Sequence, residues 1–114
     1  MFRDFYIGFI KVHILHHAVE GPIYGLAMME ELGRHGYEIS AGTLYPILHA
    51  MEEAGWLDRQ ERQVDGRVRK YYTATSEGQQ ALADVKARIR ELAEEVLEGH
   101  GPGQLPASED DEVS

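Results

Sequence analysis

The stretch WLDRQERQVDGRVRKYYTAT, residues 56–75, predicts two strands joined by a tight turn. The Asp-Gly pair at 65–66 is a strong signal for a two-residue hairpin turn, because both residues tolerate the positive φ angles that such a turn requires. Side chains alternate across a strand, so Arg67, Arg69 and Tyr71 are expected to point out of one face together. The stretch therefore predicts a cationic, aromatic β-hairpin.

The charge of this hairpin opposes the charge of the whole chain. The 114 residues carry 11 Lys and Arg against 20 Asp and Glu, a formal net charge of −9. Residues 59–70 reverse the balance, with five basic against two acidic side chains, a local net charge of +3. Lys70 contributes to this patch from the face opposite Arg69. A cationic patch on an anionic body favours a polyanionic partner at that place.

Three helices are predicted before the hairpin, over residues 4–19, 24–36 and 41–55. The first has Asp4 as a plausible N-cap and apolar residues on nearly every face, so we expect it to be covered on more than one side. In the third, Pro46 lies where it removes a backbone hydrogen bond. Either that helix effectively begins late, or its first turn is irregular.

A long helix is predicted after the hairpin, over residues 75–99, with Thr75 as its N-cap. Apolar side chains recur along it at intervals of 3, 4, 3 and 4 residues, which is the spacing of a coiled-coil seam. The seam consists of Leu82, Val85, Ile89, Leu92 and Val96. Packing on its own domain is one role for such a seam, but a long, narrow stripe favours a partner helix. We therefore expect a homodimer.

The order helix, helix, helix, hairpin, helix predicts a mainly α fold with a two-stranded β-wing (α+β). This is a winged helix-turn-helix with a C-terminal dimerisation helix. We expect a DNA-binding domain at 1–74, the dimerisation helix at 75–98 and a disordered acidic tail at 99–114, where Gly, Pro and Ser replace apolar residues. In such a fold one helix can enter the major groove while the basic hairpin grips the backbone.

Composition excludes several classes of protein. The chain has no cysteine, so disulfides and Cys-ligated zinc are excluded. No run reaches the roughly 18 apolar residues of a membrane span, and the N-terminal run has no basic leader, so we expect no signal peptide and a cytoplasmic location. The carboxylates show no recognisable catalytic arrangement, and we predict that the protein is not an enzyme.

Specific segments resemble a known family. GTLYPILHAMEEAGWL at 42–57 resembles the recognition-helix signature of the PadR family of transcriptional regulators, and GRVRKYYTATSEG at 66–78 resembles its wing and the entry into its last helix. HILHHAVEGPIYGLAMMEEL at 13–32 resembles its first two helices, and the likeness extends over about 5–98, as in the short form with a single C-terminal helix. The chain departs from the family pattern at Ala74, where a larger aliphatic residue is usual.

The resemblance implies a homodimeric repressor that binds double-stranded DNA with an inverted repeat and is released by a small effector of unknown identity. It places DNA-binding residues on the third helix and the wing: Ser40, Ala41, Gly42, Thr43, Tyr45, Pro46, His49, Arg67, Arg69, Lys70 and Tyr71. For Tyr45 the alternative is an ordinary half-buried aromatic. The alternative function is a winged-helix protein-protein interaction module without DNA binding, although such a module has no need of a basic outward strand.

Two further groups of side chains are candidates for ligand binding. Aromatic residues near the expected dimer interface are candidates for a weak effector pocket, with membership of the core as the alternative: Phe5, Tyr6, Phe9 and Trp56. His13, His16 and His17 suggest a metal or haem site, and His13 and His17 lie four residues apart, the spacing of metal-binding helices. Because no third ligand is apparent, we predict no metal and no cofactor.

Overall fold

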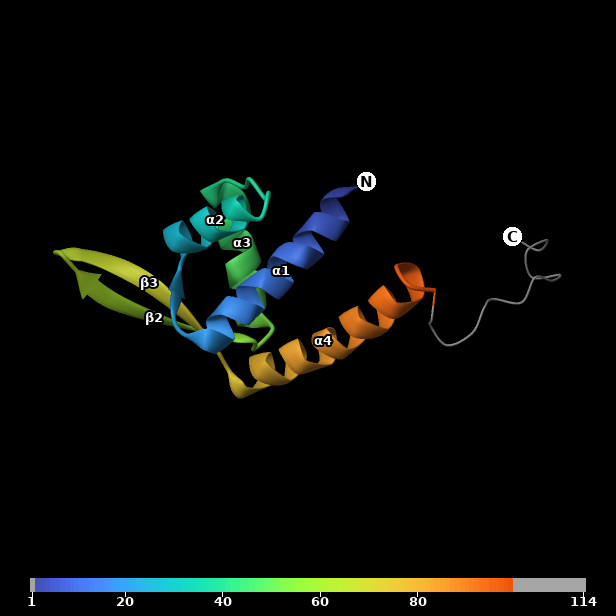
Figure 1. The fold of residues 1–114 in the computed structure, drawn as a ribbon. Helices are drawn as coiled ribbons and strands as arrows, with labels where there is room; N and C mark the ends of the chain where they lie inside the picture. The colour runs from blue at the N-terminus through green and yellow to red at the C-terminus, as the bar shows by residue number, and fades with distance from the viewer. Residues whose placement is uncertain (1, 100–114) are drawn as a thin grey trace. The chain divides into compact units, whose positions relative to one another are not determined.

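A computed structural model describes residues 2–99 of the chain. The elements are α1 (Phe2–Glu20), β1 (Ile23–Tyr24), α2 (Gly25–Arg34), α3 (Ala41–Glu53), β2 (Leu57–Val64), β3 (Arg67–Ala74) and α4 (Ser76–Val96) (Figure 1). The mainly α fold with a β-hairpin is confirmed. The chain divides into two compact units, Met1–Ala83 and Asp84–Ser114. Apart from Gly99, the predicted tail at 99–114 lies outside the described residues.

Helix α1 begins at Phe2, so Asp4 lies within its first turn and the prediction of Asp4 as N-cap was wrong. An acidic side chain there still interacts favourably with the positive end of the helix dipole. The helix ends at Glu20, one residue beyond the predicted range of 4–19. The backbone N–H of Gly21 donates to the carbonyl of His17 at 3.1 Å, and the following Pro22 cannot extend the helix.

Helix α3 runs through Pro46 without a break. It starts after Ser40, whose carbonyl accepts from the backbone N–H of both Thr43, at 3.0 Å, and Leu44, at 2.9 Å. The first turn thus combines an i→i−3 bond with an i→i−4 bond, as is common at helix termini. Pro46 has no N–H to donate, so the helix keeps its course with one fewer bond.

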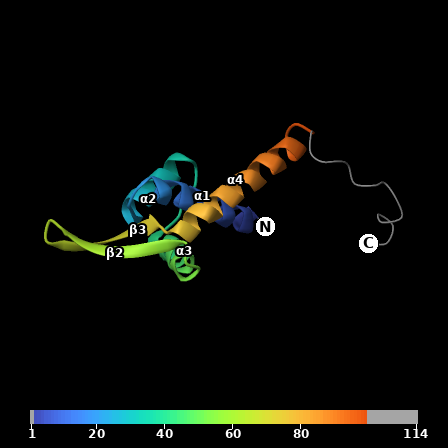
Figure 2. The same ribbon diagram turned by 90° about the horizontal axis from the view of Figure 1, so that it is seen from below.

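The sheet has three strands in the order β1-β3-β2, all antiparallel, rather than the two that were predicted. Strand β1 pairs Ile23 with Tyr72 and Tyr24 with Tyr71, so Tyr24 belongs to the sheet and not to the second helix. The long hairpin of β2 and β3 extends beyond this short strand (Figure 2). Its turn residues Asp65 and Gly66 have φ angles of 53° and 77°, as the predicted two-residue turn requires.

The core of the first unit is built from one face of each helix and the base of the sheet. Leu44, Leu48 and Met51 of α3 are at most 1% exposed, in keeping with their helical spacing. The buried cluster consists of Ile10, Ile14, Leu15, Ala18, Met28, Leu32, Leu44, Ile47, Leu48, Met51, Leu57, Tyr72 and Leu82. This core fixes α3 against the strands, and thereby positions its outer face.

Helix α4 is capped as predicted. The backbone N–H of Gly78 donates to the Thr75 hydroxyl at 2.9 Å, and that hydroxyl donates to the carbonyl of Gly55 at 2.6 Å. Beyond Leu82, the seam is largely open to solvent, with Ile89, Leu92 and Val96 exposed. Among the described residues, none of these helices is both long and apolar enough to span a membrane.

Candidate nucleic-acid interface

A groove of about 530 Å³ lies between α3, the start of α2 and strand β3. Its lining residues are Tyr24, Gly25, Leu26, Tyr45, His49, Arg67, Val68, Arg69 and Lys70. We call this the wing groove, where the wing is β2, β3 and their turn. Five of the predicted DNA-binding residues line it, so side chains separated by about twenty positions in the sequence meet in one concave surface.

The ring of Tyr45 in the wing groove lies against Gly25, where the lack of a Cβ atom makes room for it. A Cβ atom placed on Gly25 would lie 2.7 Å from Cζ of Tyr45, closer than real Cβ atoms approach other atoms. Tyr45 is half-buried and also packs against the core. The two interpretations of this tyrosine are therefore compatible: its inner part is packed, while its outer part lines the groove.

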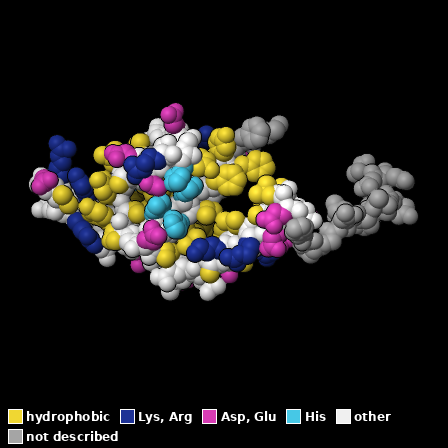
Figure 3. Space-filling model, viewed as in Figure 1, with side chains coloured by type: hydrophobic (Ala, Val, Ile, Leu, Met, Phe, Trp, Pro, Cys, Tyr) yellow, Lys and Arg dark blue, Asp and Glu magenta, His cyan; other side chains and the backbone are white. Residues whose placement is uncertain are grey.

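The outward face of the wing carries alternating cations and aromatic rings. The guanidinium carbon of Arg69 lies 4.8 Å from the centre of the Tyr24 ring, and that of Arg62 lies 4.9 Å from the Tyr71 ring. The two tyrosine rings meet edge to face at 5.6 Å. Cation–π contacts at this range hold guanidinium groups in place while leaving their N–H donors available. Figure 3 shows Lys and Arg side chains along the hairpin.

Two members of this arrangement were not predicted. Arg62 lies directly opposite Arg69 in the hairpin register, which the Asp-Gly turn sets, so the turn signal alone was sufficient to find it. Tyr24 reaches the wing only through the pairing of β1 with β3, a contact between residues nearly fifty positions apart. No local pattern in the sequence indicates that pairing.

A second groove, of about 320 Å³, lies between α1 and α3, and we call it the helix groove. It is lined by Arg3, Ile7 and Lys11 of α1 and by Gly42, Thr43, Pro46, Ile47 and Ala50 of α3. Three more predicted DNA-binding residues therefore lie here. The cations Arg3 and Lys11 were not predicted, because α1 was interpreted by its apolar content alone.

The remaining predicted residues of α3 lie at its N-terminus. Ser40 and Ala41 are exposed, and the Ser40 hydroxyl donates to the Thr43 hydroxyl at 3.4 Å. Ser40 makes no side-chain hydrogen bond to the backbone as a cap. Exposed small residues at a helix N-terminus allow close approach, and the backbone N–H groups there favour an anion.

The aromatic residues proposed for an effector pocket lie in different environments. Phe5, Tyr6 and Phe9 are 61%, 53% and 52% exposed on α1, and Tyr6 packs edge to face on Tyr37 at 5.7 Å. Trp56 instead packs against the core cluster. An effector pocket formed by these four residues remains a prediction.

Potential metal ligands gather at the end of α1. Glu20 joins His16 and His17 there, with the ligand atoms of all three within 4.8 Å of one another. The sequence had suggested His13 with His17 and no third ligand. His13 instead stacks on His35 at 4.6 Å, and its pKa is lowered by burial and then by the neighbouring His35.

Helix α2, helix α3 and the hairpin that follows define a winged helix-turn-helix protein. Residues 14–84 match the family of PadR-like transcriptional regulators, and the chain belongs to that family. Its function is thus that of a transcriptional regulator rather than an enzyme. Members of the family bind DNA, and the two grooves lie on the elements through which winged helices do so.

Individual relatives agree with this assignment. The transcriptional regulator Rv3488 of Mycobacterium tuberculosis is 46% identical over 97 residues, which cover 85% of this chain and 91% of the relative. A PadR family regulator from Eggerthella lenta is 34% identical with a TM-score of 0.72, over 80% of both chains. A PadR-like transcription factor from Bacteroides fragilis is 26% identical with a TM-score of 0.73, over 83% of this chain and 93% of the other.

Proposed function

We propose that the protein is a homodimeric repressor that binds an inverted-repeat operator, with α3 in the major groove and the wing on the DNA backbone. The observation that carries this proposal is the wing groove, in which Tyr45 and His49 of α3 lie beside Arg67, Arg69 and Lys70 of β3. Contacts to phosphates position a protein on DNA, whereas contacts to base edges give specificity. One surface here offers residues suited to both tasks.

The two grooves suggest which residues perform which task. Thr43, Tyr45 and His49 belong to the helix that would enter the major groove, so we assign base contacts to them. The wing cations, with Tyr71 beside them, would contact phosphates. Arg3 and Lys11 in the helix groove supply positive charge on α1, and we assign them to phosphates as well.

Charge favours this function over a protein-interaction module. The chain has a net charge of −9, so it repels DNA everywhere except where cations gather. Arg62 and Arg69 lie against tyrosine rings on the outward face of the wing, a placement that suits contact with an anionic partner. General repulsion with local attraction also reduces non-specific binding, which suits a regulator that must find one operator.

The dimer is proposed from the seam on α4. Ile89, Leu92 and Val96 are exposed at coiled-coil spacing, and a second copy of the helix would cover them. Two-fold symmetry would then present two α3 helices to half-sites about 34 Å apart. A small effector would release the operator by changing that spacing, and paired spin labels on the two α3 helices would detect the change.

The proposal is tested by selecting fragments of genomic DNA that the purified protein retains. We expect the retained fragments to share an inverted repeat, and footprinting to protect two half-sites one helical turn apart. Retention of no fragment, together with specific retention of a protein partner, would support the interaction module instead. Retained fragments with a single, unrepeated site would reject the dimeric arrangement.

A further inference from the structure

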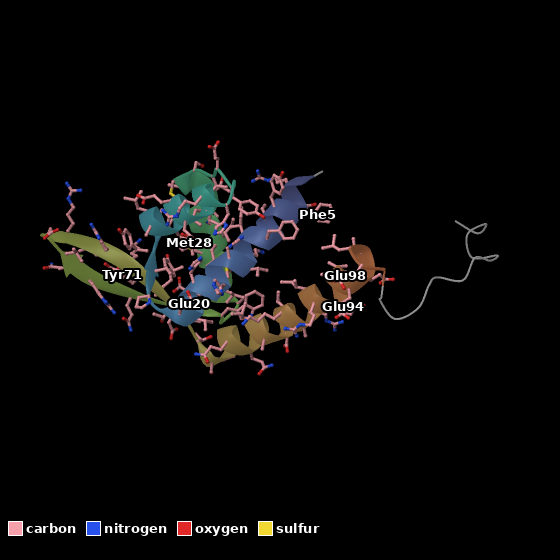
Figure 4. The ribbon with its side chains drawn as sticks, viewed as in Figure 1. Phe5, Glu20, Met28, Tyr71, Glu94 and Glu98 are labelled. Carbon is pink, nitrogen blue, oxygen red and sulfur yellow. The ribbon has the colours of Figure 1, made fainter. Side chains whose placement is uncertain are left out.

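The last turn of α1 carries a compact group of nitrogen and oxygen atoms that the DNA-facing grooves do not use. His16 Nε2 lies 3.6 Å from Glu20 Oε2, and His17 Nδ1 lies 3.8 Å from Glu20 Oε1. Figure 3 shows histidines gathered beside acidic side chains on this face, and Figure 4 labels Glu20 at the end of α1. None of the three residues lines the wing groove or the helix groove.

Two distances within this group come near the dimensions of a metal site, and all three ligand atoms lie within 4.8 Å of one another. Ligand bonds of about 2.0–2.2 Å in a tetrahedral zinc site place neighbouring ligand atoms about 3.3 Å apart. The separations of 3.6 and 3.8 Å lie close to that value without a bound ion. Small rotations of the three side chains would bring two imidazole nitrogens and one carboxylate oxygen onto a common centre.

A second layer of polar contacts lies behind His17. Its other nitrogen, Nε2, lies 3.4 Å from Oε2 of Glu31 on α2. Glu31 in turn accepts a hydrogen bond from Arg34 at 2.6 Å and lies 2.9 Å from Nε2 of His35. A histidine that binds a metal through one nitrogen usually donates its other N–H to a carboxylate, which fixes the ring and its tautomer.

The partners of Glu31 suit this supporting role. Arg34 donates to its Oε1, while its Oε2 lies 2.9 Å from Nε2 of His35 and 3.4 Å from Nε2 of His17. An exposed ion pair between His17 and Glu20 would contribute little to stability. Such a pair would not need a carboxylate from a second helix at the other nitrogen of the His17 ring. The support from a second helix is what distinguishes the group from ordinary exposed ion pairs.

We propose that His16, His17 and Glu20 bind one divalent transition-metal ion of the zinc type, with Glu31 as the residue that positions His17. Two imidazoles and a carboxylate suit Zn²⁺ and its neighbours such as Co²⁺ and Ni²⁺, whereas Mg²⁺ and Ca²⁺ prefer oxygen alone. Three protein ligands leave the fourth position of a tetrahedral ion to water.

The site also lies where an ion can influence the DNA-facing elements. Glu31 belongs to α2, and the first residue of α2, Gly25, lies directly against the ring of Tyr45 in the wing groove. An ion on His17 would therefore tie the end of α1 to α2 through Glu31. We expect the ion to act as an effector of DNA binding, and this second part of the proposal rests on the function proposed above.

Titration of the untagged, metal-free full chain with Zn²⁺ tests the site without any DNA. We expect one ion per chain at this site, lost in the double variant His16→Gln, His17→Gln and weakened at least about tenfold in Glu20→Gln, since even supporting residues are worth 10–100-fold in affinity. Glu31→Gln should cost about tenfold through the orientation of His17. The matched control Glu30→Gln, an exposed carboxylate next to Glu31, should bind as the wild type does.

Two outcomes would overturn the site: a wild-type chain that does not bind Zn²⁺, or a double variant that binds it equally well while its circular dichroism is unchanged. The effector role is tested separately, on a selected operator. Zn²⁺ should change the operator affinity of the wild type and leave that of the double variant unchanged. Identical affinities with and without Zn²⁺ in the wild type would overturn that role. Failure to select any operator would reject the proposed DNA-binding function. The metal titration uses no DNA, so its result would still decide whether the site binds Zn²⁺.

Discussion

The pair α2 and α3 in the first unit and the part of α4 in the second differ in how far a single copy of the chain buries their apolar side chains. In the first, the apolar faces of α2 and α3 converge on a core whose central residues are at most a few per cent exposed. In the second, Ile89 is 47% exposed and Leu92 58% exposed at the spacing of a coiled coil. The apolar faces of α2 and α3 are thus buried within one chain, whereas the seam of α4 is left for a further helix to cover. Helix α1 of the first unit also leaves apolar side chains exposed, at Phe5, Tyr6 and Phe9. The difference supports our proposal that the first unit recognises DNA and the second mediates assembly.

The largest expected effect comes from placing charged side chains on the apolar seam of α4. The double variant Ile89→Asp, Leu92→Asp should abolish the dimer, because four carboxylates would meet in one apolar interface. Sedimentation at micromolar concentration should show monomers, and operator affinity should fall because two linked half-sites become two independent ones. The matched control Ala83→Asp, Ala87→Asp adds the same charge on the opposite face of α4 and should remain dimeric. A wild-type chain that is itself a well-folded monomer would contradict the assignment.

The next effect concerns the close approach of α2 to α3. Gly25→Ala should displace the Tyr45 ring, since the new methyl group would overlap it. If Tyr45 contacts a base, discrimination for the operator should drop by about 1–3 kcal/mol. Gly33→Ala is the control, because Gly33 lies on the same helix with open space around it and alanine there favours the helix. Equal operator binding by the two variants would show that the position of Tyr45 does not matter.

A smaller effect tests the junction between hairpin and last helix. Thr75→Ala removes the N-cap bond to Gly78 and the bond to the carbonyl of Gly55. We expect a loss of about 1 kcal/mol in the free energy of unfolding from the cap, measured by urea denaturation. Thr75→Ser retains a hydroxyl and should recover most of that loss. No difference between the Ala and Ser variants would mean that these hydrogen bonds do not stabilise the fold.

The smallest expected effect is that of the α1 cations. Arg3→Ala and Lys11→Ala should each weaken binding to operator and random duplexes alike, and lower the salt slope by about one unit if each contacts one phosphate. Lys86→Ala, on α4, should leave the slope unchanged. An unaltered slope in both α1 variants would restrict the interface to α3 and the wing.

Local patterns predicted most of the fold. The three helices before the wing, the Asp-Gly turn and the Thr75 cap are each specified by neighbouring residues, and each was found within a few positions of its place. Strand β1 was missed because Ile23 and Tyr24 form only two residues of strand, and their partners Tyr72 and Tyr71 are remote in sequence. A strand of two residues is too short to show a hydrophobic periodicity in the sequence.

In the candidate interface, too, the predicted parts depend on neighbouring residues, and the parts that were missed depend on contacts between residues remote in the sequence. Wing cations were found because alternation along one strand is a local property. Arg3 and Lys11 reach α3 only through the packing of α1 in the tertiary fold. The group of His16, His17 and Glu20 is local, but its support by Glu31 comes from another helix, and that contact is absent from any pattern within α1.

The central claim is that the wing holds DNA by phosphate charge while α3 supplies sequence preference. A salt titration of the wild type and the Arg67→Ala, Arg69→Ala double variant, on operator and scrambled duplexes, tests it most directly. We predict that the variant loses affinity for both duplexes in similar proportion, with a salt slope lower by about two units. Equal affinities of the two proteins for both duplexes, at every salt concentration, would contradict the account.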